Sequence, residues 1–194
     1  MYAILELENR TYEASDAEIG KAYKKLALKF HPDKLGDKIT EQDKAMWLKI
    51  QDAYETLLDP AKRKKYDSSL PFNDSIPSMG DWTDDKTFYE VFSAVFNRNS
   101  MWAKKKPVPN VGDDATPMAE VKKFYKFWDN FESWREFSQY DEYDLNEAAD
   151  RYEKRYMDSE NKKLRAKYEK KERARLIKLV EMCYNNDPRI KKEL

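Results

Sequence analysis

The tripeptide His31-Pro32-Asp33 places the chain's only histidine and a carboxylate on either side of a proline. Imidazole can donate or accept a hydrogen bond, and a carboxylate can accept hydrogen bonds from a cation or from backbone N–H groups. Because the proline ring fixes its own backbone, such a segment loses little conformational entropy when it docks onto a partner. A lone histidine, a lone cysteine and the absence of a glycine-rich phosphate loop provide no catalytic set, so we expect a binding protein and not an enzyme.

Basic side chains precede the tripeptide at helical spacing, and they lie on other faces than the apolar stripe. The residues are Lys21, Lys24, Lys25 and Lys29. Together they would attract an acidic partner surface and make association sensitive to salt. The alternative interpretation is a solvated helix face beside an ordinary loop histidine.

A second basic cluster lies near the end of the chain and consists of Lys162, Lys163, Arg165, Lys167, Lys170, Lys171, Arg173 and Arg175. Residues 151–178 hold twelve basic and five acidic side chains, whereas residues 128–150 hold eight acidic side chains against one arginine. These two blocks are hidden in a net charge of zero for the whole chain. A dense basic helix can meet nucleic-acid phosphates and release counterions. Pairing with the acidic block, or with acids on the same helix, is the alternative.

Local signals predict the elements that position the tripeptide. Ser15 and Glu18 match a capping box that starts a helix, and Pro32 should stop that helix near Phe30, leaving a tight exposed loop. A second helical stripe runs from Met46 to Leu57 and should pack against the first. Short helices are expected at residues 2–7 and 61–66. The hairpin would hold the tripeptide at one end.

The rest of the chain also favours helices, with four glycines and abundant Lys, Glu, Ala and Leu, so the fold class is all-α. Residues 69–85 form a linker rich in Pro, Asp and Ser, and 86–194 form a second domain. The aromatic residues at helical spacing in 88–96 and 121–137 are predicted to form the hydrophobic core of this domain. A second linker is expected at residues 107–114. Thr116 and Pro117 should start the helix that follows. A charged helix at about 146–185, with Asp144 and Glu147 as caps, would be roughly 60 Å long.

No apolar run reaches the length of a membrane span, and no signal peptide opens the sequence, which favours the cytosol or nucleus. One cysteine permits no internal disulfide and no cysteine-only zinc site. We therefore expect no metal, cofactor, small-molecule substrate or membrane partner.

Residues 1–68 resemble the J domain of DnaJ-type proteins. The resemblance rests on Tyr2-x-x-Leu5, Ala22-Tyr23-Lys24-Lys25-Leu26-Ala27, His31-Pro32-Asp33-Lys34, Ala53-Tyr54-x-x-Leu57 and Asp59-x-x-Lys62-Arg63-x-x-Tyr66-Asp67. It implies that the tripeptide and the lysines of the second helix dock onto a chaperone of the heat-shock-protein-70 type and stimulate its ATP hydrolysis. The aspartate that usually precedes the first tyrosine has no place here, because only Met1 precedes Tyr2.

Residues 72–194 are similar to the zuotin homology region. The matching motifs are Phe88-Tyr89-Glu90-Val91-Phe92, Val121-x-x-Phe124-Tyr125-x-Phe127-Trp128, Ser133-Trp134-Arg135-Glu136-Phe137 and Asn186-Asp187-Pro188-Arg189-Ile190. With the first resemblance, they point to the zuotin family. This implies a cytoplasmic, ribosome-associated co-chaperone whose basic helix touches rRNA and protein of the large subunit near the tunnel exit, to serve nascent chains.

Family members also carry an N-terminal segment that binds an atypical heat-shock-type partner, and charged C-terminal parts that anchor the ribosome. Neither part is found in this sequence, so we expect it to be a fragment of a longer protein. Two other interpretations stay open. A general substrate-carrying J protein would need a Gly/Phe-rich linker or paired cysteine motifs, which four glycines and one cysteine do not supply. A nucleic-acid-binding or nuclear J-domain protein that does not act in translation is the stronger alternative.

Overall fold

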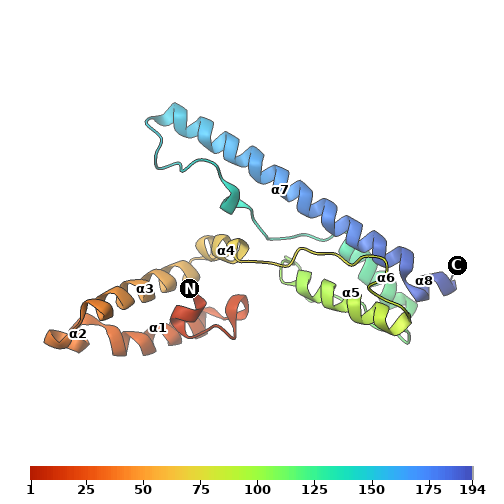
Figure 1. Cartoon of the computed structure of the whole chain (residues 1–194), viewed down its shortest axis with the longest axis horizontal. Coiled ribbons are helices and arrows are strands. Elements are labelled where there is room, and N and C mark those ends of the chain that lie inside the picture. The colour runs from red at the N-terminus through yellow and green to blue at the C-terminus, as the bar shows by residue number, and fades with distance from the viewer. Residues whose placement is uncertain (194) are drawn as a thin grey trace. The chain divides into compact units, whose positions relative to one another are not determined.

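The structure is a computed structural model that describes residues 1–193. Within this range it contains helices and no β-strand, which confirms the all-α prediction. The chain divides into two compact units, Met1–Leu70 and Pro71–Leu194 (Figure 1). Each unit has its own hydrophobic core and is described separately below.

The first unit is built on two long helices joined by short helical turns. Its elements are η1 (Tyr2–Leu5), η2 (Thr11–Glu13), α1 (Asp16–Phe30), α2 (Pro32–Leu35), η3 (Gly36–Lys38), α3 (Glu41–Leu58) and α4 (Pro60–Ser69). The predicted capping box of Ser15 and Glu18 starts α1, and α1 ends at Phe30 as expected. A second capping box, formed by Thr40 and Asp43, starts α3 and was not predicted.

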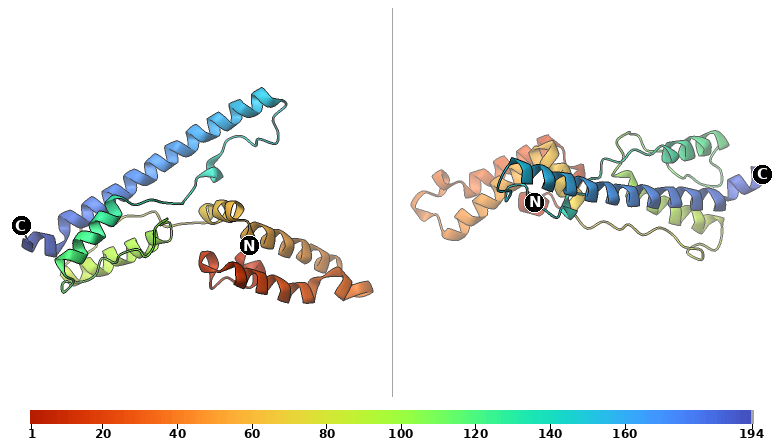
Figure 2. Two further views of the ribbon diagram at one scale, coloured as in Figure 1. Left: turned by 180° about the vertical axis from the view of Figure 1, so that it is seen from behind. Right: turned by 90° about the horizontal axis from the view of Figure 1, so that it is seen from above.

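Helices α1 and α3 lie side by side as an antiparallel hairpin with α2 at one end (Figures 1 and 2). Ile19 and Leu26 of α1 and Ile50 of α3 are buried between them, as their helical spacing predicts. The ring of Tyr23 stacks on the rings of Tyr54, at 4.0 Å, and Trp47, at 5.8 Å. Burying these side chains fixes the two helices against each other.

Arg63 of α4 ties the two ends of the first unit together. Its guanidinium donates hydrogen bonds to the hydroxyl of Tyr2 at 3.0 Å and to the backbone oxygen of Ala14 at 2.7 Å. The Tyr2 hydroxyl in turn donates to the carboxylate of Asp67 at 2.9 Å. These bonds connect η1 and the start of α1 to α4, and thereby close the unit.

The second unit contains α5 (Asp85–Ser100), α6 (Met118–Asp129), η4 (Ser138–Tyr140), α7 (Arg151–Asn186) and α8 (Pro188–Glu193). Helix α7 begins later than the expected residue 146, because Asp150, and not Asp144 or Glu147, accepts hydrogen bonds from the first free N–H groups. Its 36 residues give a length of about 54 Å. Helix α6 begins one residue later than expected, so that Pro117, whose ring has no hydrogen-bond acceptor, is the N-cap, and no side chain caps the helix. The hydroxyl of Thr116, the expected cap, donates to Asp113.

Aromatic side chains form the centre of this second core, as their spacing predicts. Phe88, Phe92 and Phe96 of α5 are almost completely buried. The ring of Phe96 lies 4.8 Å from that of Phe124 and 4.7 Å from that of Trp128, both on α6. The C-terminal part of α7 covers these rings, whereas its N-terminal part projects beyond α5 and α6 and is accompanied only by the chain that precedes it (Figures 1 and 2).

The segment 71–84, expected to be a linker, has no helix but is bound to the second unit. The ring of Trp82 packs edge-on against Phe92 at 5.1 Å, and Ile76 also contacts the aromatic core. Asp74 forms an ion pair with Arg135 at 2.6 Å. The segment therefore belongs to the second unit.

Candidate functional site

The tripeptide lies at the exposed end of the α1–α3 hairpin, where the structure has the short helix α2 in place of the expected tight exposed loop. His31 leaves α1 in an extended conformation and immediately caps α2, whose first residue is Pro32. The imidazole Nδ1 accepts a hydrogen bond from the backbone N–H of Asp33 at 3.1 Å. The neutral imidazole therefore carries its proton on Nε2, which is the nitrogen that remains to donate to a partner.

In the tripeptide, the ring of His31 is packed against the hairpin, whereas the carboxylate of Asp33 is exposed to solvent. The His31 ring packs edge-on against Trp47 of α3 at 5.0 Å, which fixes its orientation. The carboxylate of Asp33 is 88% exposed, and its Oδ2 lies 3.8 Å from His31 Nδ1. A rigid imidazole and an accessible carboxylate are thus presented together, as docking onto a donor-rich surface requires.

The four lysines predicted to join this surface are exposed on α1. Of these four lysines, only Lys25 forms an ion pair with another described residue, namely Glu6 at 2.5 Å. This bond holds the pKa of Glu6 below its ordinary value. The ammonium of Lys29 lies 5.0 Å from the ring centre of Phe30. Leu28 is 70% exposed between them, so the face is basic with one apolar side chain.

The second predicted cluster lies on α7, and six of its eight members point to solvent: Lys162, Lys163, Lys167, Lys170, Lys171 and Arg173. Lys162 pairs with Asp158 at 2.7 Å and Lys163 with Glu160 at 2.6 Å, but both ammonium-bearing side chains stay about 70% exposed. Exposed pairs of this kind are weak and exchange readily with other anions. These six side chains can therefore meet phosphate groups.

Arg165 and Arg175, the other two members, are occupied within the unit. Arg165 donates two hydrogen bonds to Asp141, and this pairing raises the pKa of the arginine. Arg175 binds Glu172 at 2.8 Å and the side chain of Asn99, on α5, at 2.7 Å. In this structure both guanidinium groups act to hold the unit together.

Arg135 is the centre of a buried charge cluster that sequence reasoning missed. Its guanidinium binds Asp74 at 2.6 Å and Glu172 at 3.1 Å and lies over the rings of Phe72 and Trp102. Burial opposes the charge, yet the two carboxylates raise the pKa of Arg135 above its ordinary value. The only signal in the sequence is a single arginine within an acidic and aromatic segment.

Asn161 attaches the segment before α7 to the helix itself. Its side chain is completely buried, although it lies in the projecting part of α7. It accepts hydrogen bonds from the backbone N–H groups of Glu142 and Tyr143 and donates one to the backbone oxygen of Tyr143 at 2.8 Å. The acidic segment therefore lies along one side of the basic helix, which leaves the opposite side open.

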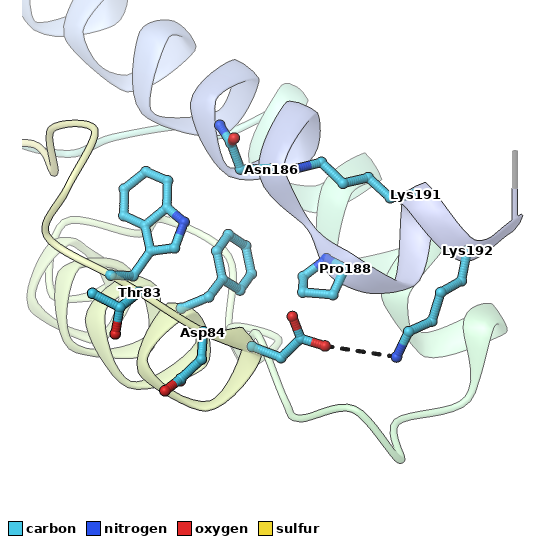
Figure 3. Close-up of a pocket in the computed structure, with 9 residues that line it drawn as sticks. Thr83, Asp84, Asn186, Pro188, Lys191 and Lys192 are labelled. Carbon is cyan, nitrogen blue, oxygen red and sulfur yellow. Dashed lines mark ion pairs between the residues drawn. The ribbon is translucent and has the colours of Figure 1, made fainter.

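A cavity of about 410 Å³ lies between the start of α5 on one side and α8 with the last residue of α7 on the other (Figure 3). Trp82, Phe88 and Pro188 form its apolar wall, and Lys192 pairs with Asp85 across its rim at 3.7 Å. None of the predicted contact residues lines it.

The remaining chemical groups are the possible metal ligands, the single cysteine and the longer helices of residues 1–193. No group of three or more His, Cys, Asp or Glu side chains there could hold a metal ion. Burial raises the pKa of the Cys183 thiol to about 12, which keeps it protonated and unreactive. None of the described helices has both the length and the apolar character needed to cross a membrane.

Comparison with known proteins agrees with this two-part arrangement. A family model described as the DnaJ domain matches residues 1–67, and one described as the zuotin-like zuotin homology domain matches residues 87–191. The DnaJ homolog subfamily C member 2 of Bos taurus is 44% identical over 195 residues, which cover 98% of this chain and 31% of the relative. Zuotin of Saccharomyces cerevisiae is 38% identical over 192 residues, which cover 98% of this chain and 44% of the relative.

The chain thus spans less than half the length of these relatives, and it matches them across both units. A more distant relative, the DnaJ homolog subfamily C member 21 of Bos taurus, is 32% identical over 206 residues, covering 92% of this chain and 38% of the relative. The unit that carries the tripeptide and the unit that carries the basic helix are each matched by one of the two family models. The chain belongs to the zuotin family of J-domain proteins.

Proposed function

We propose that this chain is the ribosome-associated, co-chaperone part of a longer protein. Its first unit stimulates ATP hydrolysis by a chaperone of the heat-shock-protein-70 type, through His31, Pro32, Asp33 and the lysines of α1. Its second unit binds the large ribosomal subunit near the tunnel exit, through the exposed basic side chains of α7. The observation that carries the proposal is that one chain has an exposed, rigid tripeptide on one compact unit and an exposed basic helix face on another.

The physical roles of the two surfaces differ. The tripeptide has fixed geometry and an accessible carboxylate, so it suits a specific contact with an ATPase. The α7 face has a high density of exposed lysine, whose pairs with Asp158 and Glu160 are weak, so it suits duplex RNA, which is met through its backbone and shape. Binding by this face should weaken steeply as salt rises.

Two matched sets of variants test the proposal. Asp33→Asn should abolish stimulation of the partner's ATPase and leave ribosome binding unchanged, because it removes one exposed charge; Asp37→Asn, also exposed and close by, is the control. Stimulation that survives Asp33→Asn contradicts the proposed role of the tripeptide.

For the second surface, Lys162→Glu, Lys163→Glu and Lys170→Glu together should release the chain from ribosomes sedimented at graded salt. The magnitude of the slope of log affinity against log salt should fall by about 2.7 if all three lysines contact phosphates of a duplex. Lys122→Glu, Lys123→Glu and Lys126→Glu on α6 make the same change in net charge and are the control. Equal sedimentation of the two triple variants would place the ribosome contact elsewhere.

The second candidate function is that of a nucleic-acid-binding or nuclear J-domain protein that acts outside translation. The exposed lysines of α7 favour this function, because lysine contacts to phosphate carry no base-sequence information and would allow binding to nucleic acids other than rRNA. The two functions differ in competition: excess duplex DNA, which lacks the A-form shape of duplex RNA, should fail to displace the chain from ribosomes if α7 recognises rRNA, but should displace a general nucleic-acid binder.

A further inference from the structure

Two tyrosines near the start of α7 are exposed to an unusual degree. Tyr152 is 81% exposed and Tyr156 is 57% exposed. Their spacing of four residues places the two rings on the same side of the helix, one turn apart. Asn161 lies nine residues after Tyr152, which at about 3.6 residues per turn places it on roughly the opposite side of the helix from that ring. The segment that Asn161 holds reaches the edge of the tyrosine side through Tyr143. No hydrophobic core of the described residues includes these rings.

Tyr156 is nevertheless held in a defined orientation. The ring of Tyr143 meets it edge-on, with 6.1 Å between the ring centres and 61° between the planes. Tyr143 is itself fixed, because Asn161 binds both its backbone N–H and its backbone oxygen. A buried amide on α7 therefore positions, through Tyr143, an aromatic ring that stays open to solvent.

Both basic and acidic side chains surround the two rings. Among residues 151–163 five basic side chains outnumber three acidic ones, and two of the acids, Asp158 and Glu160, form exposed pairs with Lys162 and Lys163. Arg155, Lys162 and Lys163 are exposed within two to three turns of the tyrosines. Residues 151–163 contain no Leu, Ile, Val or Phe, and their single methionine is only partly exposed. Protein interfaces are depleted in lysine at their centres and use apolar neighbours, whereas sites for unpaired nucleotides combine aromatic rings with basic side chains.

We infer that Tyr152 and Tyr156 form a stacking platform for unpaired RNA bases, with Arg155, Lys162 and Lys163 contacting the flanking phosphates. This inference rests on the proposed RNA binding by α7. It adds a preference for RNA with unpaired bases over fully paired RNA, which lysine–phosphate contacts alone cannot provide. A fully paired duplex offers the platform no free base face, so only a bulge or loop would use the tyrosines. The platform would therefore direct the helix to a site where unpaired bases lie next to a duplex.

The test uses the full chain and two RNA hairpins that differ only in a bulge of two unpaired adenines. The unaltered chain should bind the bulged hairpin about 10-fold more tightly than the paired one. The double variant Tyr152→Ala/Tyr156→Ala should lose this preference and bind the paired hairpin as before. The matched control, Tyr152→Phe/Tyr156→Phe, keeps both rings and should keep the preference, while circular dichroism checks that all variants retain their helix content.

The outcomes separate the platform from the proposed function. If the double alanine variant keeps the preference for the bulge, or the unaltered chain shows none, the platform is wrong while RNA binding by α7 stands. If the double alanine variant leaves ribosomes but binds both hairpins normally, the tyrosines contact a ribosomal protein, which also overturns the platform. If the unaltered chain binds neither hairpin nor ribosomes, the proposed function itself fails.

Discussion

Charged side chains in this chain fall into two groups that differ in their surroundings. Asp33 and the exposed lysines of α1 and α7 face solvent and are available to partners. Asp187 and Arg189 are buried together at the end of α7, with exposed fractions of 0% and 4%. Because removing one member of a buried pair leaves an uncompensated charge, the second group supports the fold, whereas the first group is the one that we propose for binding.

At the residue scale, Asp187→Asn should lower the unfolding free energy of the second unit by about 3 kcal/mol at pH 7. Asp187 accepts hydrogen bonds from Arg189 and from the hydroxyl of Tyr125, both at 2.7 Å. Burial alone would raise the pKa of Asp187, but these bonds outweigh it and hold the pKa below the ordinary 3.8. The ionised form therefore stabilises the fold above pH 3.8, and this stability is lost as the pH falls through the lower pKa of the folded state.

The measurement is chemical denaturation followed by circular dichroism, from pH 7 down to pH 2. The stability difference between the unaltered chain and Asp187→Asn should shrink below pH 3.8, while the exposed control Asp129→Asn should match the unaltered chain throughout. A difference that stays constant to pH 2 would contradict the role of the ionised carboxylate.

At the scale of elements, α7 has two parts with different support. Its C-terminal part buries Leu176, Leu179 and Val180 in the aromatic core. Its N-terminal part has only the segment 138–146 beside it, attached by Asn161, the Arg165–Asp141 pair and the stacked rings of Tyr140 and Tyr168 at 3.9 Å. An isolated helix of that composition would fray in water, so these contacts keep the basic face ordered.

Asn161→Ala should detach this segment from the helix. It removes three hydrogen bonds to the backbone of Glu142 and Tyr143, and their N–H groups would then be satisfied by water. Amide hydrogen exchange at these two residues should accelerate by about 10-fold, corresponding to the loss of about 1.4 kcal/mol of local stability. Protection at residues 176–183 should not change.

Asn185→Ala is the control, because Asn185 is an exposed asparagine on the same helix. Unaltered exchange at Glu142 and Tyr143 in the Asn161→Ala variant would show that the other contacts hold the segment without the amide.

At the scale of the whole molecule, the chain consists of two compact units with separate cores, and residues 71–85 of the predicted linker belong to the second unit. Trp82, Ile76 and Asp74 all lie in that segment and contact side chains of the second unit. A fragment meant to carry the second unit should therefore begin at residue 71 and not at residue 86.

Comparing fragments 71–194 and 86–194 tests this directly. The shorter fragment loses the burial of Trp82 and Ile76 and leaves Arg135 without Asp74, so its unfolding free energy should be lower by about 3 kcal/mol or more. Thermal unfolding followed by circular dichroism measures the difference. Trp82→Ala in the longer fragment separates the aromatic contribution, and equal midpoints for the two fragments would show that residues 71–84 are a true linker.

Much of the fold follows from local sequence signals. Ser15 and Glu18 start α1, Pro32 ends it, and the spacing of Phe88, Phe92 and Phe96 predicts one buried face of α5. These features depend on residues within a turn or two of each other, so the sequence alone contains the interacting groups. The family resemblance of both halves was also readable from motifs.

The tertiary structure decided which charged residues are free to bind a partner. Lys170 and Arg175 are both basic residues of the same run, but Arg175 contacts Asn99, 76 residues away, whereas Lys170 is exposed to solvent. In the same way, Asn161 becomes a buried attachment point only because the chain folds back along α7. Composition and helical spacing do not encode such distant partners, because a long-range ion pair is set by how the elements pack and not by the residues next to it.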